Sequence, residues 1–236
     1  MNLVYKEVLR AIRRYGLIEK DEKICVALSG GKDSTALLFI LNYLRRHSPL
    51  SFDLSASHIK TADYDTSMLR AYCDTLEVPY FEGALDRMPA ARVKNHCYLC
   101  ARLKRGALSA LLRRKGIRKA AFGHHATDAA ETFLMNLVEH GKIGSFCPRV
   151  ATGSGPIIIR PMIYLEEQTI IRLHRYAKLP LLDYSCPFAE ANRRTAYKKY
   201  LEQLEELAGI KRLASRIVQA LDNVDTNDIW KDLIKK

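Results

Sequence analysis

The sequence has few cysteines and no long apolar run. Its 236 residues contain 6 cysteines, too few for the disulfide framework of a small secreted domain. No stretch approaches the roughly 18 consecutive apolar residues of a membrane-spanning helix. Residues 1–16 form an amphipathic pattern with four basic residues and no cleavage site, unlike a secretory signal. We therefore expect a cytoplasmic protein that does not associate with membranes.

Acidic side chains are absent from residues 91–120, whereas basic side chains are concentrated there. The basic residues of this segment are Arg92, Lys94, Arg102, Lys104, Arg105, Arg113, Arg114, Lys115, Arg118 and Lys119. They account for most of the formal net charge of +12. Localised positive charge attracts polyanions and supplies phosphate contacts. A solvated helix face is the alternative interpretation, but the lack of compensating acids favours a nucleic-acid partner.

Short apolar runs alternate with helical patterns in the first two thirds of the chain. The predicted strands cover 24–28, 52–59, 78–83, 119–123 and 156–161, and the predicted helices 33–46, 64–77, 97–115 and 127–139. This alternation indicates an α/β fold with a mostly parallel sheet and helices on both faces. In such folds ligands bind at the carboxyl ends of the strands.

Beyond residue 162 only helical patterns occur. They cover 166–176, 189–207, 211–222 and 227–234. We therefore expect an α/β domain over residues 1–162, including an N-terminal helix, and a helical C-terminal extension over 163–236. The Gly- and Ser-rich residues 151–156 precede this extension and are typical of a surface loop.

The first predicted strand ends in the sequence SGGKDS, residues 29–34. The glycines let the backbone approach a ligand closely, and the following helix presents unpaired N–H groups and a positive dipole end. These features predict a phosphate-binding loop, although a tight strand-to-helix connection is the alternative. Neither the Walker A pattern nor G-x-G-x-x-G is present, so an ordinary P-loop nucleotidase and a dinucleotide fold are not indicated.

Three of the cysteines have a spacing that occurs in metal and iron–sulfur sites. Cys97 and Cys100 make a C-x-x-C motif, and Cys186 follows far along the chain, whereas the other three cysteines have structural contexts. A closed structural zinc site needs four ligands, and no second pair completes one. Three thiolates suit a cluster with one open iron. The spacing by itself leaves zinc, iron–sulfur and structural roles open.

The string SGGKDS resembles the signature of the ATP pyrophosphatases, or PP-loop enzymes, which cleave ATP between the α and β phosphates. The resemblance implies that pyrophosphate binds at Ser29, Gly30, Gly31, Lys32, Asp33 and Ser34, with Asp33 also serving catalysis. It places the adenine near the end of the second strand, residues 56–60, where His58 lies. Residues 122–128, with Gly123 and His124, would close the nucleotide pocket.

Residues 97–150 together with 156–170 resemble the tRNA 2-thiocytidine synthetase family, and the likeness spans roughly residues 20 to 200. The resemblance implies ATP, Mg²⁺ and a [4Fe–4S] cluster held by Cys97, Cys100 and Cys186, whose open iron carries sulfide. It assigns catalytic roles to Lys104 and Asp128. Thr127 replaces the first of two aspartates usual in that family. The context of Cys186 resembles the related 2-thiouridine branch, but the thiocytidine branch is favoured.

The implied activity is tRNA thiolation: ATP adenylates the C2 oxygen of a pyrimidine, and sulfur then replaces it. The basic segment and a second cluster, residues 193–199, would hold the tRNA backbone. The sulfur donor is open between sulfide, a cysteine desulfurase and a sulfur-carrier protein, and the resemblance allows a homodimer. The alternatives are a PP-loop ligase of lysidine-synthetase type, and a non-catalytic RNA-binding protein with a structural metal.

Overall fold

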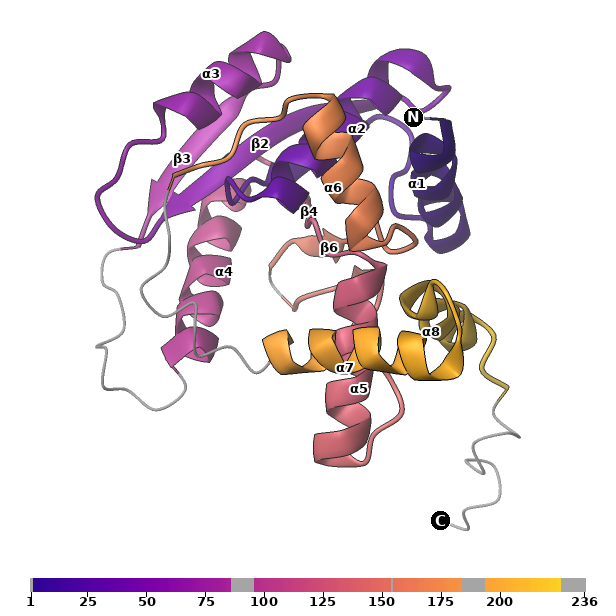
Figure 1. The fold of residues 1–236 in the computed structure, drawn as a ribbon. Coiled ribbons are helices and arrows are strands. Elements are labelled where there is room, and N and C mark those ends of the chain that lie inside the picture. The colour runs from indigo at the N-terminus through magenta and orange to yellow at the C-terminus, as the bar shows by residue number, and fades with distance from the viewer. Residues whose placement is uncertain (1, 86–95, 154, 184–193, 226–236) are drawn as a thin grey trace.

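The computed structural model describes residues 2–85, 96–153, 155–183 and 194–225. Helices and strands alternate through the first part, as the apolar pattern predicts (Figure 1). The described elements are α1 (Asn2–Tyr15), β1 (Glu22–Ala27), α2 (Lys32–His47), β2 (Phe52–Lys60), α3 (Ser67–Thr75), β3 (Tyr80–Ala84), α4 (His96–Arg114), β4 (Lys119–Ala121), α5 (Ala126–His140), β5 (Arg149–Val150), β6 (Ile157–Ile159), α6 (Glu167–Tyr176), α7 (Arg194–Ala208) and α8 (Leu213–Asp222).

The strands form one sheet in the order β3-β2-β1-β4-β6-β5. Every pairing is parallel except that of β5 with β6. The predicted mostly parallel α/β fold is thus confirmed. The chain leaves β1 for β2 on one side and later returns to β4 on the other, so the strand order reverses at β1. The carboxyl end of β1 is therefore the switch point at which such sheets bind ligands.

The residues of β1 divide between two apolar layers because successive side chains of a strand point to opposite faces. Ile24 and Val26 enter the larger core together with α1, α2 and α6. Cys25 faces the other way, where it packs with Leu108 and Leu112 of α4. Helices therefore cover both faces of the sheet, and Cys25 has the structural role expected of a buried thiol.

The last three described helices, α6, α7 and α8, pack at two different places on the α/β domain. Helix α6 packs against α2 beside the sheet, whereas α7 and α8 pack against α5, which α7 crosses in Figure 1. These helices correspond to the helical patterns predicted at 166–176, 189–207 and 211–222. The helix predicted at 227–234 lies outside the described residues, and the domain division at residue 162 stays a prediction. None of the helices in the described ranges has the length and hydropathy needed to cross a bilayer.

Candidate active site

The segment that joins β1 to α2 is a compact turn organised by Ser34. The Ser34 hydroxyl accepts hydrogen bonds from the Gly30 N–H at 3.2 Å and from the Ser29 hydroxyl at 3.0 Å, and it donates to the Gly31 carbonyl at 3.0 Å. Gly31 is the extended N-cap of α2. The N–H groups of the first helical turn have no carbonyl partner within the helix and form its positive end. This end of the sheet is therefore suited to an anion such as phosphate. We call residues 29–34 the phosphate loop.

Position 30 requires glycine for two reasons: its backbone conformation and the closeness of Leu182. Its φ of +85° lies in the region that side-chain-bearing residues rarely adopt. A Cβ atom at this position would lie 2.5 Å from the Cβ of Leu182. The Leu182 N–H also donates to the Gly30 carbonyl at 2.9 Å. The chain that leads toward Cys186 is thus anchored on the phosphate loop.

Lys32 belongs to a chain of charges that links three helices. Its Nζ lies 3.0 Å from Asp33 Oδ2 and 2.9 Å from Glu167 Oε1 on α6. The other carboxylate oxygen of Glu167 pairs closely with Lys198 on α7. Burial opposes the charge of Lys32, but the two carboxylates outweigh it and raise its pKa. Burial likewise opposes ionisation of Glu167, yet the two lysines lower its pKa to about 2. Lys32 and Glu167 are therefore both charged at neutral pH.

Asp33 and Asp128 converge on His125, a buried residue that the sequence analysis did not single out. His125 Nε2 lies 3.7 Å from Asp33 Oδ1 and 3.4 Å from Asp128 Oδ2. Asp128 also accepts a hydrogen bond from the His125 backbone N–H at 2.9 Å, which caps α5. The buried Oδ1 of Asp33 accepts no hydrogen bond from the described residues. A carboxylate oxygen with unused lone pairs faces the site.

Thr127 has a structural role at the position where an aspartate is usual. Its hydroxyl accepts a hydrogen bond from the backbone N–H of Glu167 at 3.1 Å. This N–H belongs to the first turn of α6 and has no carbonyl partner within that helix. Thr127 thus holds the start of α6, and with it the Glu167 carboxylate, beside the phosphate loop.

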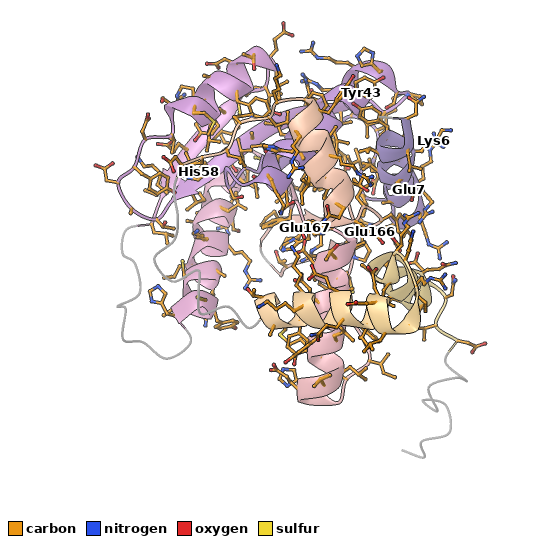
Figure 2. All side chains as sticks on the ribbon, in the orientation of Figure 1. Lys6, Glu7, Tyr43, His58, Glu166 and Glu167 are labelled. Carbon is orange, nitrogen blue, oxygen red and sulfur yellow. The ribbon has the colours of Figure 1, made fainter. Side chains whose placement is uncertain are left out.

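His58 closes another side of the site, at the end of β2 (Figure 2). Its Nδ1 lies 2.7 Å from the Leu28 carbonyl and therefore carries the proton, so Nε2 accepts from the Tyr64 hydroxyl at 2.8 Å. Burial lowers the pKa of His58, and the positive charge of Lys104 lowers it further. Lys104 on α4 thus lies within electrostatic range of His58. The catalytic role expected of Lys104 stays a prediction.

The segment after β4 contacts the start of α2 through Gly123. Gly123 lies against the start of α2, where its missing Cβ leaves room for the backbone of Asp33. The His124 ring lies 5.8 Å from that of Phe122 and 5.2 Å from that of Phe146. Gly123, His125 and Asp128 thus lie beside Asp33, and the closing of a nucleotide pocket by residues 122–128 stays a prediction.

Cys97 and Cys100 lie on the first turn of α4, three positions apart and hence on one face of the helix. Cys97 is exposed and Cys100 is partly exposed. Cys186 lies outside the described residues, and so does Arg193. Within the described ranges, no group of three or more His, Cys, Asp or Glu side chains is arranged to hold a metal ion. The structure thus describes two of the three cysteines expected to hold the cluster, and their role as ligands stays a prediction.

The basic segment is less uniform than its sequence implied. Arg102, Lys104 and Arg105 are exposed on α4, whereas Arg92 and Lys94 lie outside the described residues. Lys119, expected among the tRNA contacts, is only 3% exposed. It donates to the Leu17 carbonyl and pairs with Glu22. Counting it as a contact for the nucleic acid was wrong, because strand β4 directs its side chain inward.

Comparison with known proteins identifies the group to which this site belongs. Residues 3–199 match the profile of the PP-loop domain family. A tRNA-cytidine(32) 2-sulfurtransferase from Geobacter sulfurreducens is 34% identical, with 94% of this chain and 91% of that protein aligned. One from Xanthomonas oryzae pv. oryzae is 35% identical over 84% of this chain and 68% of that protein. The chain belongs to the PP-loop family, in the group of the tRNA-cytidine(32) 2-sulfurtransferases.

A solved structure supports the PP-loop fold of this chain. The U34-tRNA thiolase NcsA from Methanococcus maripaludis, determined with its [4Fe-4S] cluster, aligns with a TM-score of 0.74 at 20% identity, over 93% of this chain and 79% of that one. At that identity the likeness establishes the fold alone. The preference for the cytidine branch rests on the sequence relatives and is confirmed by them.

The sequence gives little indication that Glu167 and His125 belong to the PP-loop site. Glu167 lies more than 130 positions from Lys32, and only the packing of α6 against α2 unites them. His125 stands beside His124 in the sequence, and nothing in the pattern says which imidazole faces the carboxylates. The structure chooses His125, because it is the extended N-cap of α5.

Proposed function

We propose that this PP-loop protein is an ATP-dependent tRNA sulfurtransferase that converts cytidine 32 to 2-thiocytidine. The observation that carries the proposal is the intact phosphate loop, with Asp33, His125 and Asp128 grouped at its edge, in a chain whose relatives are named for this reaction. The cytosolic location, the sulfur donor and a homodimeric assembly stay predictions.

The first step activates the base. The α2 N-terminus and Lys32 would bind the pyrophosphate part of ATP. The C2 oxygen of cytidine attacks the α-phosphorus, so a new P–O bond forms while the bond to the bridging oxygen breaks, and pyrophosphate leaves with that electron pair. The adenine would lie toward the end of β2, near His58.

Mg²⁺ fits the carboxylates of Asp33 and Asp128. Magnesium is usually bound by one or two carboxylates together with waters and substrate phosphates. The buried Asp33 Oδ1, which accepts no hydrogen bond from the described residues, is suited to such a ligand. When bound, the ion would neutralise charge on the phosphates. Because Thr127 stands in place of the first of the two usual aspartates, Asp33 and Asp128 are the protein ligands that we assign.

The second step replaces oxygen by sulfur. A sulfur nucleophile attacks C2 of the adenylated base, so a C–S bond forms, and the C–O bond breaks as AMP departs with the former C2 oxygen. Lys104 would stabilise the negative charge that develops on the departing group. We assign Asp128 to accept a proton or to hold the ion during the first step.

The [4Fe–4S] cluster fits the thiols on α4 and the course of the chain toward Cys186. Cys97 and Cys100 are accessible and share one helix face. Leu182, which precedes Cys186 by four positions in the sequence, is held on Gly30 at the loop. When bound, the cluster would supply an open iron position for sulfide.

Metal analysis and nucleoside mass spectrometry together test the proposal. Protein reconstituted without oxygen is expected to hold about four irons and four sulfides per chain, and to form 2-thiocytidine in a tRNA transcript with ATP. A transcript with uridine at position 32 is expected to gain no 2-thiocytidine at that site. Zinc in place of iron, or no thiolation by cluster-loaded protein, would contradict the proposal.

Single-cysteine variants separate thiolation from ligase chemistry. Cys97→Ala, Cys100→Ala and Cys186→Ala are expected to lose the cluster and the activity. Cys147→Ala, which removes another exposed thiol, is the matched control and is expected to keep both. A PP-loop ligase of lysidine-synthetase type couples an amine and has no need of these thiols, so coupling of an amine to the tRNA base by all three variants, without thiolation, would favour that ligase.

A further inference from the structure

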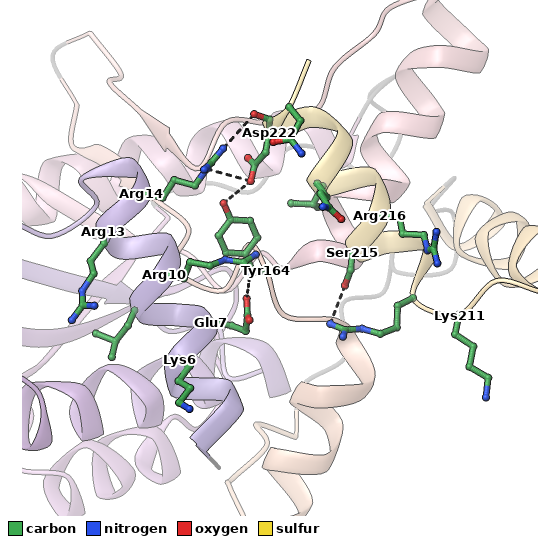
Figure 3. A pocket seen from close by; sticks show the side chains of 15 residues that line it. Lys6, Glu7, Arg10, Arg13, Arg14, Tyr164, Lys211, Ser215, Arg216 and Asp222 are labelled. Carbon is green, nitrogen blue, oxygen red and sulfur yellow. Dashed lines mark hydrogen bonds and ion pairs between the residues drawn. The ribbon is translucent and has the colours of Figure 1, made fainter. Parts of the chain in front are cut away.

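A concavity lies between α1 and α8 and has a volume of about 1210 Å³ (Figure 3). Seven basic side chains line it against two acidic ones: α1 supplies four of the basic residues, and the region from residue 211 into α8 supplies three. We call this surface the α1–α8 groove. No part of the phosphate loop lines it, so it is a separate feature of the molecule.

The two acids of the groove are already engaged. Glu7 pairs with Arg10 at 3.1 Å. Asp222 accepts a hydrogen bond from the Tyr164 hydroxyl at 2.6 Å and another from Tyr15, and it pairs with Arg14 at 3.4 Å. Each acid is thus matched locally, and the remaining basic side chains keep their charge for a ligand.

The basic residues that remain come from both walls. Among the described residues, no acidic side chain pairs with Lys6 and Arg13 on α1 or with Lys211 and Arg216 on the opposite wall. All four are exposed. Opposed cations with no acid between them raise the local concentration of anions. A chain of phosphates lying in the groove would meet basic groups on each side.

The groove is preformed because a tyrosine cluster holds its walls together. The hydroxyl oxygens of Tyr164 and of Tyr15 on α1 lie 2.8 Å apart, and each hydroxyl donates its one proton to the carboxylate of Asp222 on α8. The Arg10 guanidinium lies 3.8 Å from the centre of the Tyr164 ring, a cation–π contact that fixes its orientation. A ligand would therefore have to immobilise few side chains of the groove, and the entropic cost of binding would be small.

Two consecutive glutamates connect the groove to the ATP site. Glu166 accepts hydrogen bonds from Ser215 of α8, through the hydroxyl at 2.6 Å and the N–H at 3.2 Å. Glu167, the next residue, pairs with Lys32 of the phosphate loop, and Figure 2 shows both glutamates at the start of α6. Tyr164 precedes Glu167 by three positions, a span of at most about 11 Å. One polyanion can therefore reach both surfaces.

We propose that the α1–α8 groove binds the phosphate backbone of the substrate tRNA away from the base that is modified. Guanidinium groups suit phosphate because they donate paired hydrogen bonds. An acidic protein is less well matched, because protein interfaces are built around apolar anchors, and only Leu9, Tyr164 and Val218 of the lining are apolar. The choice of tRNA as the ligand rests on the proposed function.

Charge reversal on both walls tests the groove. Lys6→Glu with Arg216→Glu is compared with Lys20→Glu with Lys23→Glu, which makes the same change in net charge at exposed positions near the start of β1. Binding of tRNA transcript is measured by fluorescence anisotropy over a range of KCl concentrations. The groove variant is expected to bind roughly tenfold more weakly at low salt, with a log–log salt slope smaller by about 1.5 to 2. The control variant is expected to match the wild type.

A second readout separates the groove from the activity. Binding of a fluorescent ATP analogue is expected to be unchanged in the groove variant, because neither substituted residue touches the phosphate loop. If the groove variant binds tRNA as the control does while the wild type thiolates tRNA, the groove proposal is overturned and the proposed function stands; an acidic partner protein would then be sought. If the wild type neither binds nor thiolates tRNA, both proposals fail.

Discussion

The backbone of Asp33 lies directly against Gly123. An ideal Cβ at Gly123 would stand 3.0 Å from the carbonyl carbon and oxygen of Asp33 and 3.1 Å from the Ser34 nitrogen. This contact joins the phosphate loop after β1 to the segment after β4, although 90 positions separate them in the sequence. The grouping of Asp33 with His125 and Asp128 depends on it.

Gly123→Ala should therefore impair ATP binding as well as stability. The added methyl must displace main-chain atoms that cannot rotate away, and overpacking of this kind costs about 1–3 kcal/mol of unfolding free energy. Gly106→Ala is the control: Gly106 lies inside α4 with nothing within 4 Å of its Cβ position, so a gain of about 0.5–1 kcal/mol is expected. Urea unfolding and ATP titration of both variants check this. Equal behaviour of the two would contradict the close contact.

Gly30→Ala and Gly31→Ala should differ sharply. Alanine at position 30 meets both the φ of +85° and the Leu182 side chain, whereas Gly31 is extended and its nearest neighbour would be Ser29 Oγ at 3.6 Å. We expect Gly30→Ala to lose about 1–3 kcal/mol of stability and most of its ATP affinity. Gly31→Ala should fold normally. Circular dichroism melts and ATP titration measure the two effects, and a normally folded Gly30→Ala would count against the docking of Leu182.

Glu167 should make the stability of the protein depend on pH in the acid range. Its pKa is about 2 in the folded protein, below the unfolded value, so the unfolded chain takes up the proton first as the pH falls. The stabilisation is present above about pH 4.5 and is lost as the pH falls toward 2. Unfolding free energies of Glu167→Gln should accordingly change less than those of the wild type between about pH 5 and pH 3. Parallel curves for the two proteins would exclude this role.

Asp128→Asn should slow thiolation without unfolding the protein. The amide oxygen can still accept the hydrogen bond from the His125 N–H, while the charge needed for a base or a magnesium ligand is gone. A fall of at least about 10²-fold in the single-turnover rate is expected. Asp128→Ala should lose in addition about 1 kcal/mol of stability through the missing cap. Normal thiolation by Asp128→Asn would remove the catalytic role assigned to it.

Lys104→Ala offers a cleaner test because the side chain is exposed and has little to contribute to folding. We expect slower thiolation at unchanged stability, together with a higher pKa of His58, since the nearby cation that helps to lower it is removed. Proton NMR of the imidazole follows the pKa, and Lys115→Ala on the same segment serves as the control. An unchanged His58 titration would show that the two groups are electrostatically independent.

The parts of the site that the sequence predicts are those encoded in contiguous residues. The phosphate loop, the C-x-x-C pair and residues 122–128 were all recognisable, because a strand-to-helix turn or a helix face determines their geometry locally. Strand β5 was missed because two residues, Arg149 and Val150, carry no periodicity. Glu167 and Leu182 could not be predicted as parts of the site, since their positions depend on how α6 and the chain after it pack on the loop.

Under the proposed function, the pairing of Glu167 with two lysines changes the charges that ATP would meet in the site. Lys32 already pairs with Glu167, so a phosphate would have to replace that carboxylate as its partner. Glu167 would keep Lys198 when Lys32 moves to the phosphate, whereas Asp33 would lose its lysine partner and face the magnesium ion assigned to it above. Lys32 would thus move from the Glu167 carboxylate to the phosphate. Glu167 would repel the substrate little, because Lys198 still pairs with its carboxylate.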